Sequence, residues 1–214
     1  MRIGVFGGSF DPVHVGHLWI AESAIETLRL DQLRWLPAST SPLKPKGSVA
    51  SDKSRLEMVR LAVAGADGHV VDDRELRRGG TSYTIDTVEE LQREFPDDEL
   101  FLVIGSDSLA GMRQWHRPEE LLQMVTLAVV QRGGEPEINF GILEGIVDQD
   151  RIDKMRRSVI PMPIIEVSSR AIRQRVRTHR SIRFRVPHAV QALIKNEQLY
   201  GGEDGGGVTG TGVE

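Results

Sequence analysis

The hydrophobic positions of this chain form short continuous runs that alternate with stretches in which apolar residues recur every three or four positions. These apolar runs, some of them interrupted by a single polar residue, predict β-strands at residues 3–6, 33–36, 69–71, 100–104, 125–130 and 164–167. The helical spacing predicts amphipathic α-helices, at residues 15–29, 84–95 and 187–196, around Leu56, Val59 and Val63, from about Pro118, and through Ile172 and Val176. Residues 133–149 have no pattern that predicts an element.

Apolar strands that alternate with helices are typical of parallel β-sheets that are covered on both faces. We therefore predict an α/β fold, an open doubly wound parallel sheet of the Rossmann-like type, with ligands at the carboxyl ends of its strands. Residues 37–51 hold three prolines, five serines or threonines and one glycine, which predicts a long loop after the second strand. Long loops in compact domains are often functional.

Length and composition predict one domain followed by a tail. The chain has 214 residues, 39% hydrophobic and 27% charged, which is enough to bury a core, and we expect a single domain over residues 1–200. Residues 201–214 contain seven glycines, three acids and nothing to bury, so we expect them to be disordered. The absence of cysteine excludes a disulfide scaffold, a thiolate zinc site, an iron–sulfur cluster and a cysteine nucleophile.

The charge of the chain is unevenly distributed. The net charge is −4, but residues 151–185 contain eleven lysines or arginines and only two acids, Asp153 and Glu166. Such a cluster favours anions, although a solvated, arginine-rich helix face would account for part of it. Because Phe184 is its only aromatic residue, we do not expect nucleic-acid binding. No apolar run approaches the ~20 residues of a membrane span and no signal peptide is visible, so we expect a cytoplasmic protein.

The most informative segment, residues 7–17, reads Gly-Gly-Ser-Phe-Asp-Pro-Val-His-Val-Gly-His and lies between the first predicted strand and helix. An α/β fold places its phosphate site at this junction, where glycines let the backbone approach an anion and the helix start offers amides. His14 and His17 are three residues apart, so both can face one ligand. As metal ligands they lack an evident third partner, and helix-face histidines are often without function. The glycine turn favours a third interpretation, in which both donate to nucleotide phosphates.

Two motifs resemble those of a known superfamily. Gly-Ser-Phe-Asp-Pro-x-His-x-Gly-His, at residues 8–17, is similar to the signature of the nucleotidyltransferases that include adenylyltransferases for nicotinate mononucleotide and phosphopantetheine. Its HxGH element is shared with class I aminoacyl-tRNA synthetases. The second signature, Ser-Ser-x-x-Ile-Arg, has its match in Ser168 to Arg173, also at a predicted strand-to-helix junction.

Further segments resemble the nicotinate-nucleotide adenylyltransferase branch of that superfamily. They are residues 39–44, 82–87 and 105–109, Trp115 ahead of residues 119–121, and Arg132 after the fifth predicted strand. The resemblance covers nearly the whole chain up to Tyr200. The chain departs from the family where Ser-Pro-Leu-Lys at residues 41–44 replaces a Pro-Pro-His-Lys loop, and where Arg170 replaces a threonine.

The resemblance implies that the 5′-phosphate of nicotinate mononucleotide attacks the α-phosphorus of ATP, giving deamido-NAD and pyrophosphate. A phosphate monoester is already anionic at neutral pH, so the protein has to position the reactants and neutralise charge rather than supply a general base. Mg²⁺ would be held mainly by the ATP phosphates, without dedicated protein ligands.

The resemblance also implies a role for each matching residue. The residues implied in catalysis are His14, His17, Lys44 and Arg173. The residues implied in ATP binding are Gly7, Gly8, Ser9, Phe10, Gly105, Asp107, Ser168 and Ser169. The residues implied in binding nicotinate mononucleotide are Thr84, Trp115 and Arg132.

Several alternatives stay open at this point. A nucleotide-binding sensor would keep the fold without turnover, and an adenylyltransferase could act on another phosphomonoester, such as nicotinamide mononucleotide or phosphopantetheine. Lys44 can also be explained as a solvated loop lysine, Asp107 as a helix cap, and Trp115 as a buried loop anchor. The sequence leaves the oligomeric state open, with a homo-oligomer among the options.

Overall fold

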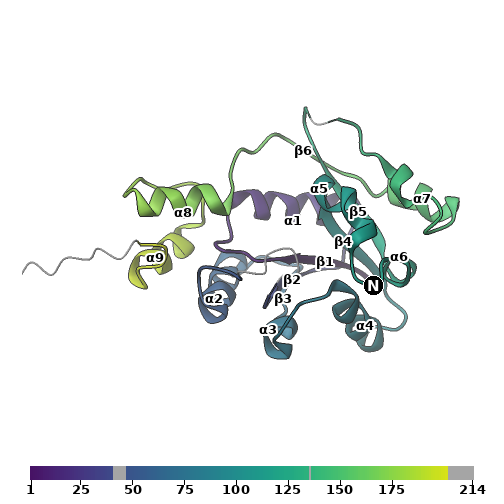
Figure 1. Ribbon diagram of the computed structural model, residues 1–214. Coiled ribbons are helices and arrows are strands. Elements are labelled where there is room, and N and C mark those ends of the chain that lie inside the picture. The colour runs from purple at the N-terminus through teal and green to yellow at the C-terminus, as the bar shows by residue number, and fades with distance from the viewer. Residues whose placement is uncertain (41–46, 135, 202–214) are drawn as a thin grey trace, which may run out of the picture.

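In the described part of the chain, the strands form one six-stranded sheet that is parallel throughout. The computed structural model describes residues 1–40, 47–134 and 136–201 (Figure 1). The strands are β1 (Arg2–Gly8), β2 (Gln32–Pro37), β3 (His69–Val71), β4 (Glu99–Gly105), β5 (Thr126–Arg132) and β6 (Ile160–Met162). They pair in the order β3-β2-β1-β4-β5-β6, which confirms the predicted doubly wound parallel α/β sheet.

Helices cover both faces of the sheet. They are α1 (Val15–Leu28), α2 (Asp52–Val63), α3 (Arg74–Arg78), α4 (Thr84–Glu94), α5 (Ser106–Ala110), α6 (Pro118–Met124), α7 (Gln149–Arg156), α8 (Ser169–Arg177) and α9 (His188–Asn196), with 3₁₀ turns η1 (Met112–Gln114) and η2 (Phe140–Leu143). Alternate residues of β4 enter two cores. Phe101 and Val103 pack in the core with α1, α2, α8 and α9. Leu100 and Leu102 pack in the core with α4, α5, α6 and α7. No helix of the described residues is both long and apolar enough to cross a bilayer.

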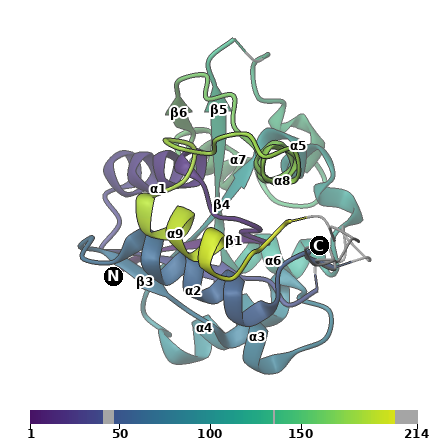
Figure 2. The same ribbon diagram turned by 90° about the vertical axis from the view of Figure 1, so that its left-hand side faces the viewer.

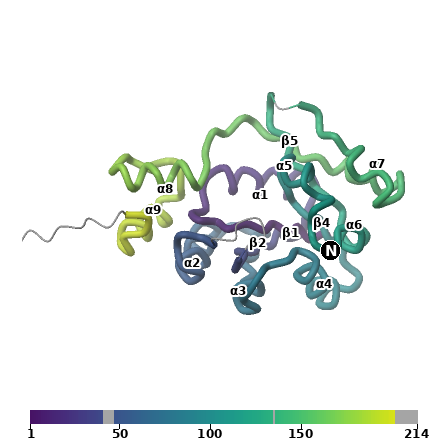
Figure 3. The backbone as a smooth tube through the Cα atoms, viewed as in Figure 1, coloured from purple at the N-terminus to yellow at the C-terminus, as the bar shows by residue number. Residues whose placement is uncertain are grey.

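The order of the strands reverses between β1 and β4. The chain builds outward from β1 through β2 to β3 and then crosses to the other side of β1, where β4, β5 and β6 follow. In open α/β sheets the carboxyl ends of the strands at such a reversal form the ligand-binding crevice. Here β1 ends at Gly8 and β4 at Gly105, both predicted to bind ATP. Figure 3 shows β1 running from the N-terminus towards the side on which α8 and α9 lie.

The prediction of a last strand at residues 164–167 is wrong. The strand lies earlier, at Ile160–Met162, and pairs with β5 through Val130 and Ile160. Because β6 is an edge strand it tolerates Pro161, and a second proline, Pro163, follows directly where the pairing ends. Ile164 is 65% exposed, which shows that this apolar run is not a buried strand. Apart from Gly201, the glycine-rich tail lies outside the described residues.

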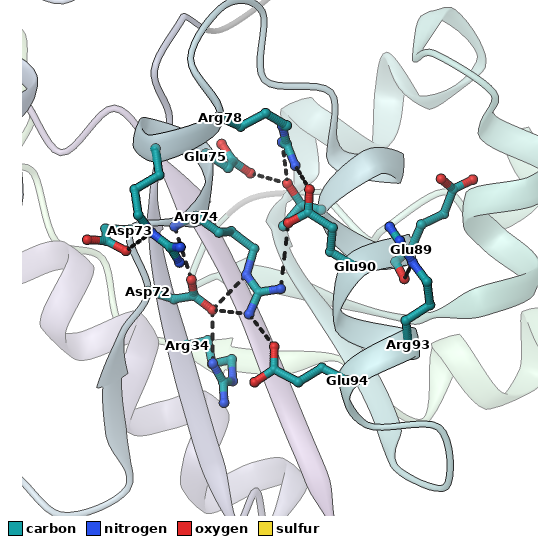
Figure 4. A network of polar contacts seen from close by, with 12 residues as sticks. Arg34, Asp72, Asp73, Arg74, Glu75, Arg78, Glu89, Glu90, Arg93 and Glu94 are labelled. Carbon is teal, nitrogen blue, oxygen red and sulfur yellow. Dashed lines mark hydrogen bonds and ion pairs between the residues drawn. The ribbon is translucent and has the colours of Figure 1, made fainter.

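Helix α3 was not predicted, because polar contacts rather than an apolar stripe hold it (Figure 4). The guanidinium of Arg74 pairs with the carboxylates of Asp72 and Glu94, at 2.8 Å each. Arg78 pairs with Glu90 at 2.7 Å. These ion pairs connect α3 to the end of β3 and to α4. Hydrophobic periodicity carries no information about such an element.

Candidate active site

The predicted phosphate loop begins where β1 ends and the chain turns towards α1. Phe10 has a φ of 45°, a left-handed backbone that non-glycine residues seldom adopt. Its buried ring lies with its centroid 5.6 Å from that of Phe6 and 5.4 Å from that of Trp35. A Cβ on Gly8 would lie 3.0 Å from the Phe10 ring, so a larger residue there would require this ring to shift. The buried ring stabilises the strained turn and thereby the position of Ser9.

Arg55 of α2 joins the ends of two neighbouring strands. Its guanidinium donates to the carbonyl oxygens of Ser9 at 2.7 Å and Ala38 at 2.6 Å. It also donates to the carboxylate of Asp52 at 2.6 Å, and the whole side chain is buried. The sequence analysis did not identify this residue, because an arginine within a helix is ordinarily exposed. Its contacts hold the loop after β1 against the loop after β2.

Asp11 is a second anchor to which the sequence analysis gave no role. Its carboxylate is buried and accepts hydrogen bonds from the backbone N–H groups of Val49 at 2.7 Å and Ala50 at 3.1 Å. The hydroxyl of Tyr200 donates to the same carboxylate at 2.8 Å. The guanidinium of Arg173 lies 3.6 Å away. A buried carboxylate needs several donors, and Asp11 takes them from two distant segments, with the Arg173 charge close by.

His14 and His17 form one unit at the start of α1. His14 is the N-cap residue, and its backbone N–H donates to Nδ1 of His17 at 3.2 Å. The two rings are stacked, with 3.7 Å between their centroids. Because Nδ1 of His17 accepts this bond, the proton of the neutral ring lies on Nε2. Burial lowers the pKa of His14 to about 4, so this ring is neutral at neutral pH.

Gly16 separates the two histidines because no larger residue fits there. A Cβ at this position would lie 2.9 Å from the side chain of Val167 and 3.2 Å from Nδ1 of His14. The glycine of the HxGH element therefore allows the segment before α8 to approach α1.

The second motif meets the first through side chains of α8. Ser168 is the N-cap of α8, and its hydroxyl accepts a backbone N–H of the first turn at 3.2 Å. The hydroxyl of Ser169 donates to the carbonyl oxygen of Pro12 at 2.8 Å. The guanidinium of Arg173 donates to the backbone carbonyl oxygen of Asp11 at 2.6 Å. Figure 1 shows α8 beginning beside the start of α1, so residues that are 157 and 162 positions apart come together here.

The end of β4 lies at the same edge of the sheet. Gly105 is the N-cap of α5, and Asp107 is the second residue of that helix. Asp107 is therefore not the cap of α5, as one interpretation of the sequence held. Its side chain is exposed at the carboxyl end of β4, next to β1 in the sheet.

The residues predicted to bind the acceptor nucleotide lie partly together. Thr84 is the first residue of α4, and Trp115 follows η1; both are half-buried. Their neighbours Tyr83 and His116 lie ring to ring, with centroids 4.4 Å apart, so the two segments are in contact. Trp115 also packs against the core under α4 and α6, which agrees with its interpretation as a loop anchor.

The loop after β2 is bound to the segment that precedes α4. The backbone N–H of Ser39 donates to the hydroxyl of Ser82 at 3.0 Å, and the N–H of Ser82 donates to the carbonyl oxygen of Thr40 at 2.8 Å. Arg132 is the last residue of β5 and is exposed. Lys44 lies outside the described residues.

The two histidines gain no metal-binding partner from the rest of the described chain. No group of three or more histidine or carboxylate side chains among residues 1–40, 47–134 and 136–201 could hold a metal ion. His69 is engaged elsewhere, since its Nδ1 accepts from Nε1 of Trp35 at 3.0 Å and its Nε2 lies 3.1 Å from a carboxylate oxygen of Glu22.

Comparison with known proteins agrees with this geometry. The family described as cytidylyltransferase-like matches residues 5–175. The probable nicotinate-nucleotide adenylyltransferase of Rhodopirellula baltica is 56% identical over 198 residues, 92% of each chain. That of Exiguobacterium sibiricum is 43% identical over 200 residues, 94% of this chain and 99% of the relative.

A solved structure has the same fold. It is the nicotinic acid mononucleotide adenylyltransferase of Plasmodium falciparum complexed with NaAD, with a TM-score of 0.71 and 16% identity over 93% of this chain and 97% of that chain. The fold is thus that of a nucleotidyltransferase, and the identity to the bacterial relatives extends over almost all of both chains. The chain therefore belongs to the cytidylyltransferase-like family and, within it, to the nicotinate-nucleotide adenylyltransferases.

Proposed function

We propose that the chain transfers the adenylyl group of ATP to nicotinate mononucleotide, giving deamido-NAD and pyrophosphate as a step of NAD biosynthesis. The observation that carries the proposal is the junction of the two motifs, made by Ser169 with Pro12 at 2.8 Å and by Arg173 with Asp11 at 2.6 Å. It gathers two histidines, an arginine and two helix starts at the end of β1, which suits a polyphosphate. The names of the relatives support the choice of acceptor.

The reaction requires little chemistry from the protein. A phosphate oxygen of nicotinate mononucleotide bonds to the α-phosphorus of ATP while the bond to the bridging oxygen of the departing pyrophosphate breaks. The attacking oxygen is anionic at neutral pH, so no base has to remove a proton. The protein has to hold two anions in line and reduce their repulsion.

The described residues divide this task. The N–H on Nε2 of His17 is a donor to the transferring phosphoryl group, oriented by the bond between its Nδ1 and the His14 backbone. His14, whose pKa burial lowers to about 4, contributes as a neutral ring. Arg173 supplies positive charge for the β- and γ-phosphates at the start of α8. By resemblance to the family, Lys44 adds a second cation.

A divalent ion fits this donor set only if the nucleotide itself holds it. Nucleotidyltransferases of this kind generally use a divalent metal ion with ATP, and we propose that the ion is Mg²⁺. The carboxylate of Asp11 is taken up by its protein donors, so we propose that phosphate oxygens and water are the main ligands. When bound, the ion would neutralise charge on the phosphate oxygens.

We place the pyridine ring of the acceptor between Trp115 and the start of α4. The indole offers a flat face to a pyridinium ring, with cation–π attraction. The backbone amides that begin α4 at Thr84 suit the carboxylate of nicotinate, since the positive end of the helix dipole lies there. Arg132, at the end of β5, adds a positive charge on the acceptor side.

Pyrophosphate release from ATP with a panel of phosphomonoesters tests the proposal. We expect rapid release with nicotinate mononucleotide and slow release with nicotinamide mononucleotide or phosphopantetheine. Preference for one of the latter would keep the adenylyltransferase and change its acceptor. ATP binding without pyrophosphate release in the presence of any acceptor would favour the nucleotide sensor.

We also propose a cytoplasmic location, which cell fractionation would test.

A further inference from the structure

We propose that Tyr200 is a positioning residue of the active site, acting through its hydroxyl on Asp11 to keep the Arg173 guanidinium available for ATP. The inference rests on the proposed function, because it assigns Arg173 to the triphosphate. Tyr200 lies 189 positions from Asp11 and four residues beyond the end of α9.

The contact between Tyr200 and Asp11 is a buried hydrogen bond. The hydroxyl donates to Oδ1 of Asp11 at 2.8 Å, and the two residues are 6% and 3% exposed. Burial, together with the nearby Asp11 charge, raises the pKa of Tyr200, so the hydroxyl keeps its proton and stays a donor. Its ring belongs to the core that α1, α2 and α8 share.

This hydroxyl determines what Arg173 binds. Oδ1 of Asp11 accepts from Tyr200 and Ala50, and Oδ2 accepts from Val49. With both oxygens supplied, Arg173 remains 3.6 Å from Oδ2 and donates instead to the Asp11 carbonyl oxygen at 2.6 Å. Removing the hydroxyl leaves a buried carboxylate short of a donor, which is costly. Arg173 already forms an ion pair with this carboxylate at 3.6 Å, so we expect it to move onto the carboxylate and away from the nucleotide.

The backbone after α9 has an unusual conformation at the residues that bring the Tyr200 hydroxyl to Asp11. Tyr200 has a φ of 63° and Gln198 one of 51°, both in the left-handed region that non-glycine residues seldom adopt. Figure 2 shows α9 beside α2, and the hydroxyl of Ser54 on α2 donates to the carboxylate of Glu197 at 2.8 Å. This second contact secures the same segment without touching Asp11, and therefore provides a control.

The test compares Tyr200→Phe with Glu197→Ala. The first keeps the buried ring and removes only the hydroxyl; the second removes the contact with Ser54 and leaves the Asp11 hydrogen bonds intact. For Tyr200→Phe we expect the KM for ATP to rise about tenfold, as for a lost hydrogen bond to a charged group, with the acceptor KM changed less than about twofold. For Glu197→Ala we expect both constants to stay near wild type. Three outcomes would each overturn the inference. In Tyr200→Phe, the KM values for ATP and for the acceptor could rise by the same factor, or the melting temperature could fall while both KM values stay normal. Alternatively, Tyr200→Phe and Glu197→Ala could change the KM for ATP equally.

Hydrogen exchange of the chain without ligands separates this inference from the proposed function. In Tyr200→Phe we expect faster exchange than in wild type at residues 47–52 and 9–14, which bind or flank the Asp11 carboxylate, while Glu197→Ala exchanges there as wild type does. If wild type releases no pyrophosphate with any acceptor, the proposed function fails, and the hydrogen-exchange rates alone test the positioning role of Tyr200. Unchanged exchange in Tyr200→Phe would then overturn the positioning role.

Discussion

The imidazole rings of His14 and His17 lie face to face, 3.7 Å apart at their centroids, while the backbone N–H of His14 donates to Nδ1 of His17 at 3.2 Å. The stack fixes the plane of the His17 ring, and the hydrogen bond fixes which of its nitrogens carries the proton. The Phe10 ring also contacts His17, with its centroid 5.1 Å from that of His17 and its plane at 75° to the imidazole. The ring of His17 is therefore oriented before any ligand arrives.

We expect His17→Ala to lower turnover by about two orders of magnitude or more, because a donor to the transferring phosphoryl group acts as charge develops there. Pyrophosphate release and circular dichroism would be measured on the same preparation, and the spectrum should match that of wild type. His188→Ala, an exposed histidine at the start of α9, is the control and should keep full activity. A His17→Ala enzyme that retained more than about a tenth of the wild-type rate would contradict the assignment.

The low pKa of His14 makes stability depend on pH. Burial lowers the pKa from 6.5 to about 4, so between these values the unfolded chain binds a proton that the folded chain does not. This contribution to stability is therefore full above the unfolded pKa and is lost as the pH falls towards the folded one. From about pH 7.5 to pH 5 we expect wild type to lose about 2 kcal/mol more unfolding free energy than His14→Asn. Urea unfolding of both proteins measures the difference. Parallel pH dependences would show that folding does not lower the pKa of His14.

Arg173 should act on ATP rather than on the acceptor. We expect Arg173→Ala to raise the KM for ATP or lower kcat, by about tenfold or more, because it removes a charged donor, with little change in the acceptor KM. Arg170→Ala is the matched control, because Arg170 is exposed on the same helix. Steady-state kinetics with each substrate varied in turn would separate the two. A loss confined to acceptor affinity would assign Arg173 to the other nucleotide.

The parts of the site that could be predicted are those in which one local segment does the work. The turn after β1 and the start of α8 each combine glycine or serine with a helix start, which the sequence alone displays. Asp11, Arg55 and Tyr200 act across the fold, and Tyr200 meets Asp11 over 189 positions. No local pattern distinguishes a buried arginine from an exposed one on the same helix, so their roles appeared only with the structure.

The strands show the same division. The central ones were predicted because burial on both faces makes them continuously apolar. The edge strand β6 was placed four residues too late, since Ile160 and Met162 are separated by Pro161, whereas residues 164–167 contain no proline and three β-branched residues. Pairing with β5, rather than hydrophobicity, decides where this strand lies.

Arg55 should matter for stability. We expect Arg55→Met to lower the free energy of unfolding by about 3 kcal/mol, because it removes the donor from the half-buried segments at Ser9 and Ala38. Arg60→Met on the same helix is the control; its side chain is 54% exposed, and we expect a change within about 0.5 kcal/mol. Denaturant unfolding measures both. Equal effects of the two substitutions would mean that the Arg55 hydrogen bonds contribute little.

The last prediction concerns the base that the enzyme accepts. Nicotinate carries a carboxylate where nicotinamide has a neutral amide, and the start of α4 at Thr84 favours the negative group. Stacking on Trp115 serves both rings equally, so the carboxylate's hydrogen bonds must discriminate. Sites built to hydrogen-bond one group reject a mismatched one by up to ~10⁴-fold, and we expect kcat/KM for nicotinate mononucleotide to exceed that for nicotinamide mononucleotide at least about a hundredfold.

Replacing the indole separates stacking from this discrimination. Trp115→Ala should lower kcat/KM for both mononucleotides by a similar factor and leave the ratio of the two values nearly unchanged. A change in this ratio would place Trp115 against the carboxylate. Because Trp115 also packs against the core, Trp115→Phe serves as the second variant, keeping an aromatic face and most of the contact. It should recover part of the activity on both mononucleotides. Equal wild-type rates on the two mononucleotides would refute the nicotinate specificity and leave the adenylyl transfer itself intact.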